Sequence, residues 1–185
     1  MGVKMTTQAN EASDQADQIK TTKGAITAPH HIGLHVGDLE RSVDFYSSVL
    51  GFEEAFRWSP DAPYIRELLG DELVAIDAVI LRLPNSNIVL ELMEFTRSRP
   101  EPADARNAAA GTAHIGFAVT GLDELYAHLL ERGVTSISEP VTPTIGPNKG
   151  GRVVYLLDPD GIRVELTQSS KWLYEFGEPA QEACC

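Results

Sequence analysis

The chain contains an internal duplication, and this repeat constrains its fold more than any other feature. The stretches "HIGLHVGDLERSVDFYSSVLGF" (31–52) and "HIGFAVTGLDELYAHLLERGV" (114–134) both begin His-Ile-Gly and continue as a short alternating strand. Each then enters an amphipathic helix that ends at a glycine. A repeat of about 80 residues is too long for a solenoid, so it indicates a duplicated module.

The segments that follow each copy complete the module. Three strand-like runs come after the first helix ("FEEAFRW", "LVAIDAVILRL", "NIVLELMEF"), and three come after the second ("VTSIS", "GRVVYLLD", "GIRVELTQ"). We therefore expect an α+β domain of two tandem βαβββ modules over 28–168. The first module would occupy 28–95, a linker 96–112 and the second module 113–168. Two such modules can share one curled mixed sheet that encloses a site.

The ends of the chain differ from this domain. Residues 1–27 are polar and almost free of large apolar side chains, which is typical of a disordered tail. Residues 169–185 form a C-terminal extension that ends in Cys184 and Cys185. Two adjacent cysteines cannot staple a fold, so the sequence favours a reducing compartment and the cytoplasm.

Strand alternation predicts which side chains face the site. In "HIGLHV", Ile32 and alternate apolar residues share one face, while His31, Gly33 and His35 share the other. Because the apolar face should pack on the helix, the histidines are expected on the open face. The same argument places His114 on the open face of the second module.

The last strand of each module carries a glutamate among apolar residues, Glu91 in "IVLELMEF" and Glu165 in "GIRVELTQ". A carboxylate in such a strand is costly unless it is paired or binds a metal. Together with His31 and His114, these residues supply two imidazoles and two carboxylates, which suit one Zn, Ni, Co, Mn or Fe ion. The alternative is two structural Glu–His pairs. Glu94 is a weaker candidate, because it falls on the opposite face and shows no counterpart in the second half.

The net charge excludes one class of partner. The formal charge of −12 would repel a phosphate backbone, so nucleic acid is not expected to bind. No run of residues is long and apolar enough to span a membrane. The expected partner is a small molecule.

Four motifs together resemble the vicinal oxygen chelate superfamily: "HHIGLHVGDLERSVDFYSSVLGF", "IVLELMEF", "AHIGFAV" and "YLLDPDGIRVEL". This superfamily includes glyoxalase I, methylmalonyl-CoA epimerase, extradiol dioxygenases and bleomycin- or fosfomycin-resistance proteins. The resemblance covers about 29–168 and implies paired βαβββ modules curled around one divalent metal. It implies His31, Glu91, His114 and Glu165 as ligands, and a homodimer whose site lies within one chain or between chains.

A metal beside two carboxylates suits removal of a proton next to a carbonyl group. Glu91 and Glu165 would act as the acid/base pair of an isomerase or epimerase, or of a glyoxalase I-like lyase, on a carbonyl substrate. Two alternatives stay open. His31, His114 and Glu165 would also serve an Fe(II) extradiol dioxygenase, and the fold also occurs in non-catalytic binding and resistance proteins.

Three further residues are candidates for substrate binding. His35 follows His31 on the same face, as a substrate contact or as a solvated strand histidine. The Gly-rich stretch "IGPNKGGR" (145–152) would form a lid whose Lys149 or Arg152 meets an anionic group, or a plain hairpin loop.

Overall fold

The computed structural model describes residues 26, 28–70, 75–97 and 111–169. The chain divides into two units, 1–31 and 32–185, and every helix and strand below belongs to the second unit. The expectations for the tail at 1–27, the linker at 96–112 and the extension at 169–185 fall almost wholly outside the described residues.

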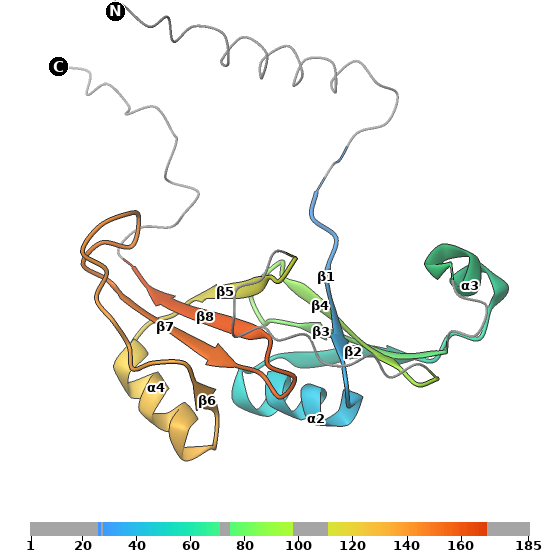
Figure 1. The fold of residues 1–185 in the computed structure, drawn as a ribbon, viewed down its shortest axis with the longest axis horizontal. Helices are drawn as coiled ribbons and strands as arrows, with labels where there is room; N and C mark the ends of the chain where they lie inside the picture. Colours follow the sequence, from blue (N-terminus) through green and yellow to red (C-terminus); the bar gives the residue numbers. More distant parts are fainter. Residues whose placement is uncertain (1–25, 27, 71–74, 98–110, 170–185) are drawn as a thin grey trace, which may run out of the picture. The chain divides into compact units, whose positions relative to one another are not determined.

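The first module has the expected order of elements with one added helix (Figure 1). Its elements are β1 (Ile32–Val36), α2 (Leu39–Asp44), the π-helical turn η1 (Phe45–Val49), β2 (Glu53–Trp58), α3 (Pro63–Leu69), β3 (Ile76–Arg82) and β4 (Val89–Phe95). The strands form a sheet in the order β1-β4-β3-β2, in which only β1 and β4 run parallel. The helix that the sequence did not predict, α3, begins at a proline and ends at Gly70 in the left-handed conformation (φ 66°).

The second module repeats this topology. Its elements are β5 (His114–Ala118), α4 (Leu122–Glu131), β6 (Thr135–Ser136), β7 (Arg152–Leu157) and β8 (Arg163–Gln168), in the sheet order β5-β8-β7-β6. The expected α+β fold of two βαβββ modules is confirmed. Among the described residues, however, each module forms its own four-stranded sheet, whereas the sequence allowed a single shared one. No helix in these ranges has the length and apolar character needed to cross a membrane.

One hydrophobic core joins the two modules. Helix α2 contacts β3 and β4, and α4 contacts β8, so each helix covers one face of its own sheet. The buried residues of this core alternate along the strands, as the sequence predicted. They include Leu34, Leu90, Leu92, Ile115, Val164 and Leu166. Glu91 and Glu165 alternate with these residues, so each glutamate lies on the face of its sheet that is turned away from the core.

A buried polar contact also links the modules. The Tyr46 hydroxyl donates a 3.0 Å hydrogen bond to Oδ2 of Asp158, and Tyr46 is 0% exposed. Oδ1 of Asp158 accepts from the N–H groups of Asp160 (2.9 Å) and Ile162 (2.7 Å). Asp160 in turn binds Arg41 on α2 at 2.6 Å. The "DPDG" turn of the second module is therefore attached to the helix of the first.

Candidate metal centre

The two modules place a glutamate at the same point of the sheet. Gly33 on β1 pairs with Glu91 on β4, and Gly116 on β5 pairs with Glu165 on β8, both in parallel register. His114 stands two residues before Gly116, just as His31 precedes Gly33 in the sequence. The sequence duplication is thus also a duplication of strand register around each glutamate.

In the second module, the histidine and the glutamate are in contact. His114 Nε2 lies 3.1 Å from Glu165 Oε2, with side chains that are 50% and 17% exposed. The Tyr155 hydroxyl donates to the same oxygen at 2.9 Å, and the Thr167 hydroxyl donates to Oε1 at 3.0 Å. Burial, followed by the hydrogen bond to Glu165, raises the pKa of Tyr155, so its hydroxyl stays protonated at neutral pH.

These two donors fit a divalent ion. Metal bonds from imidazole nitrogen and carboxylate oxygen are about 2.0–2.2 Å long, so two donors 3.1 Å apart can bind one ion side by side. Within the described residues, no group of three or more His, Cys, Asp or Glu side chains is placed to hold a metal. Within these residues, Glu91 therefore does not join His114 and Glu165 in such a group.

His31 lies in the other unit, next to His30. The Nδ1 atoms of the two histidines are 2.8 Å apart, their rings are edge to face at 5.1 Å, and both residues are exposed. A hydrogen bond to Nδ1 orients an imidazole and leaves Nε2 for a ligand, so His30 can set the orientation of His31.

His35 lies on the open face of the first sheet, as its parity predicts. Its ring centroid is 4.8 Å from that of Phe95, and in the strand register His35 is paired with Met93. Both neighbours belong to a small apolar cluster, with Trp58 from β2 and Ile65 from α3. This face therefore becomes apolar beyond Glu91 in the direction of α3.

The two cationic candidates lie in different settings. Arg152 forms a 2.5 Å ion pair with Asp123 in the first turn of α4, and it shares the α4-facing side of β7 with Val154. That side of β7 is opposite to the side that carries Tyr155, the partner of Glu165. Arg152 therefore points away from Glu165, and its ion pair with Asp123 is a structural contact. Lys149 is exposed in the loop before β7, where its N–H donates to the carbonyl of Gly146.

Glu94 has no matching carboxylate in the second module, but Gln168 shares its structural role. Oε2 of Glu94 accepts the N–H of Leu39, the first residue of α2, at 2.9 Å. Gln168 Oε1 accepts the N–H of Leu122, the first residue of α4, at 2.7 Å. Both side chains stand three residues after the open-face glutamate, and both satisfy a free N–H at a helix start.

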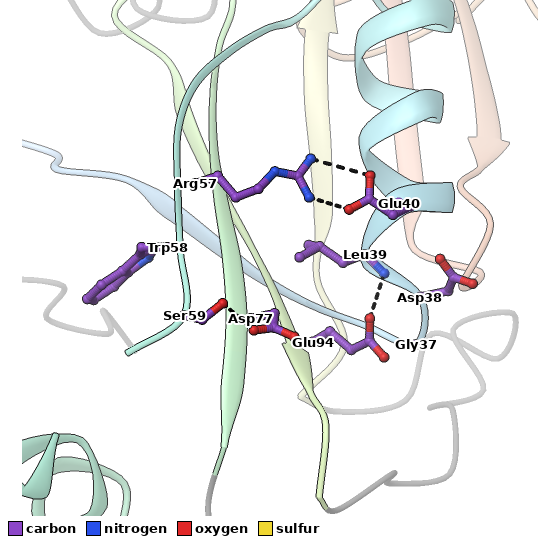
Figure 2. Close-up of a pocket in the computed structure, with 9 residues that line it drawn as sticks. All are labelled: Gly37, Asp38, Leu39, Glu40, Arg57, Trp58, Ser59, Asp77 and Glu94. Carbon is purple, nitrogen blue, oxygen red and sulfur yellow. Dashed lines mark hydrogen bonds and ion pairs between the residues drawn. The ribbon is translucent and has the colours of Figure 1, made fainter. Parts of the chain in front are cut away.

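A pocket of about 460 Å³ lies beside α2 and contains several carboxylates (Figure 2). Its lining residues are Gly37, Asp38, Leu39, Glu40, Arg57, Trp58, Ser59, Asp77 and Glu94. Glu40 pairs with Arg57, Asp77 accepts from Ser59, and Glu94 caps α2. The Trp58 ring points away from these carboxylates in Figure 2. Since Glu94 and Glu91 lie on opposite faces of β4, this pocket is separate from the metal-binding candidates.

Comparison with known proteins gives one family. The model of the Glyoxalase/Bleomycin resistance protein/Dioxygenase superfamily matches residues 28–166. A 2-epi-5-epi-valiolone epimerase from an Actinomyces species is 34% identical over 148 residues, which cover 77% of this chain and 79% of the epimerase. A lactoylglutathione lyase from Escherichia coli O157:H7 is 30% identical over 142 residues, covering 75% and 90% of the two chains.

Solved structures show the same fold. A glyoxalase family protein from Bacillus cereus superposes with a TM-score of 0.68 over 80% of this chain and 98% of its own, at 21% identity. The glyoxalase I of Leishmania major gives a TM-score of 0.57 over 77% and 87% of the two chains, at 25% identity.

Proposed function

Because the chain belongs to the glyoxalase/bleomycin resistance protein/dioxygenase superfamily, we propose that it is a metal-dependent isomerase or epimerase, or a related lyase, that removes a proton next to a carbonyl group. The observation that carries this proposal is the matching register of Glu91 and Glu165, each on the open face of its sheet. Relatives named as an epimerase and as a lactoylglutathione lyase support the same reaction class.

In this proposal, His31, Glu91, His114 and Glu165 would hold one divalent ion, which is Zn, Ni, Co, Mn or Fe. When bound, such an ion supplies positive charge that stabilises the negative charge developing on the carbonyl oxygen. A glutamate oxygen accepts the α-proton, and the second glutamate can return a proton from the opposite side of the substrate. Return to the opposite side inverts the carbon centre.

The open face around Glu91 suits this role. Its cross-strand neighbour is Ile80, which in turn pairs with Phe56 on β2, and Met93 follows two residues later on β4. Apolar side chains here would exclude water from the carboxylate once the substrate is in place. His35, on the same face, would contact the substrate, and Lys149 would meet an anionic group on it.

We further propose that a second copy of the chain completes the site. The donors do not converge within the part of one chain that the structure describes. Phe56 lies across the sheet from Glu91, with Ile80 between them, and is 59% exposed. Ile137 donates its N–H to the carbonyl of Tyr155, the cross-strand partner of Glu165, and is 49% exposed. Large apolar side chains exposed on both metal-binding faces support a homodimer in which these faces are covered.

Mixing two inactive variants tests the shared site. We expect Glu91→Gln and Glu165→Gln to be inactive alone, because each loses one carboxylate. If sites form between chains, a mixed dimer contains one intact site, so random mixing restores about one quarter of wild-type activity. Mass spectrometry of the mixed dimer verifies that the subunits have exchanged. If exchange occurs and no activity is recovered, each site lies within one chain.

The reaction class is tested by metal analysis of the purified protein, followed by NMR detection of proton–deuterium exchange. The panel contains methylmalonyl-CoA, the hemithioacetal of methylglyoxal and glutathione, and 2-epi-5-epi-valiolone. Deuterium from solvent at the α-carbon of one compound would establish the reaction and name the substrate class. Metal-dependent oxygen uptake with catechols, without exchange, would instead identify a dioxygenase.

A further inference from the structure

The two glutamates of the proposed site occupy matching positions but have different neighbours. Both oxygens of Glu165 accept hydrogen bonds, Oε2 from Tyr155 at 2.9 Å and Oε1 from Thr167 at 3.0 Å. Tyr155 also packs its ring edge to face against His114, with centroids 5.5 Å apart. One side chain on β7 thus contacts both metal-binding candidates of the second module.

The first module has apolar residues at the corresponding places. Tyr155 is the cross-strand partner of Glu165, and the cross-strand partner of Glu91 is Ile80. Thr167 follows Glu165 by two residues, and Met93 follows Glu91 by two residues. At the two positions beside Glu165 the duplicated register therefore carries hydroxyl-bearing residues, where the first module carries Ile80 and Met93.

We propose that Tyr155 and Thr167 are positioning residues that fix Glu165 and His114 as a preformed half of the metal centre. This inference rests on the proposed function and deepens it. A ligand whose side chain is already oriented loses little conformational entropy on binding, so the hydroxyl groups of Tyr155 and Thr167 strengthen metal binding by the Glu165–His114 pair.

The first test is titration of the metal-free chain with Co²⁺, followed by its visible absorption. Tyr155→Phe keeps the ring beside His114 and removes only the hydroxyl, so we expect Co²⁺ affinity to fall about tenfold and the absorption band to change. Thr167→Val, of similar shape, should weaken binding in the same direction. Tyr126→Phe is the matched control, because the Tyr126 hydroxyl contacts only the exposed carbonyl of Ser138 at 3.5 Å. The melting temperature of each variant, measured without metal, reports whether the fold is intact.

The second test repeats the titration without the Glu165 carboxylate. In the Glu165→Gln background we expect Tyr155→Phe to lower Co²⁺ affinity by less than about twofold further, because the hydroxyl acts on the ion through this carboxylate. An equal loss from Tyr155→Phe with and without the Glu165 carboxylate, or an unchanged affinity and spectrum for both Tyr155→Phe and Thr167→Val, would overturn the inference while leaving the proposed function standing. Failure of the wild-type chain to bind Co²⁺ would instead refute the proposed function and, with it, this inference.

Discussion

Removal of one buried hydroxyl, by Tyr46→Phe, tests how the two modules are joined. The ring of Tyr46 is fully buried against Phe45 and Phe52, so phenylalanine preserves the packing. The variant loses the 3.0 Å hydrogen bond to Asp158, which links the first module to the "DPDG" turn of the second. A hydrogen bond to a charged group contributes about 1.5–3 kcal/mol. For a chain of this size, that loss corresponds to a fall in melting temperature of about 3–12 °C.

The stability lost in Tyr46→Phe should depend on pH. Burial raises the pKa of Asp158 above its ordinary value, and the Tyr46 hydrogen bond opposes this rise. For a carboxyl group whose pKa is raised by folding, the associated stability is present below the unfolded pKa and is lost as pH rises through the folded pKa. The pKa of Asp158 rises further in the variant, which enlarges that loss. The free energy difference between wild type and Tyr46→Phe should therefore be larger at pH 7 than at pH 4.5.

Urea unfolding followed by far-UV circular dichroism at both pH values measures these differences, with Tyr126→Phe as the control that removes an exposed hydroxyl contact. We expect the control to change the free energy of unfolding by less than about 0.5 kcal/mol. A Tyr46→Phe difference as small as that of the control, or one that grows toward low pH, would show that the Tyr46–Asp158 contact does not stabilise the fold in this way.

Four further predictions concern the second module. Gly151→Ala should lower the melting temperature strongly, because the added Cβ would lie 2.3 Å from the backbone carbonyl oxygen of Gln168. Gly116→Ala should keep the melting temperature, because the added Cβ has no atom within 4 Å, but it should lower activity by narrowing the space on the open face. Gln168→Ala removes the acceptor for the first N–H of α4 and should cost about 1 kcal/mol in urea unfolding, and an unchanged midpoint would contradict the capping role. Arg152→Ala should leave kcat and KM nearly unchanged, because its partner is Asp123; a large rise in KM would restore the substrate contact inferred from the sequence.

The sequence by itself determined the duplicated module and the face on which each candidate lies. Both features follow from local periodicity, since alternate residues of a strand face opposite sides whatever the strand pairs with. Glu91 and Glu165 lie on the faces turned away from the core for this reason, and the fold class follows from the same patterns. The helix α3 was missed because "PYIRELL" is short and its boundaries depend on a proline and a glycine.

Only the tertiary structure decided what each of these residues contacts. Tyr155 reaches Glu165 through the pairing of β7 with β8, and Tyr46 reaches Asp158 across 112 positions of the chain. The register between strands and the packing of one module on the other are set by contacts distant in sequence, which local periodicity does not encode. For the same physical reason, the sequence placed two equivalent glutamates in the chain, and only the fold placed the hydroxyl groups of Tyr155 and Thr167 on the carboxylate of Glu165.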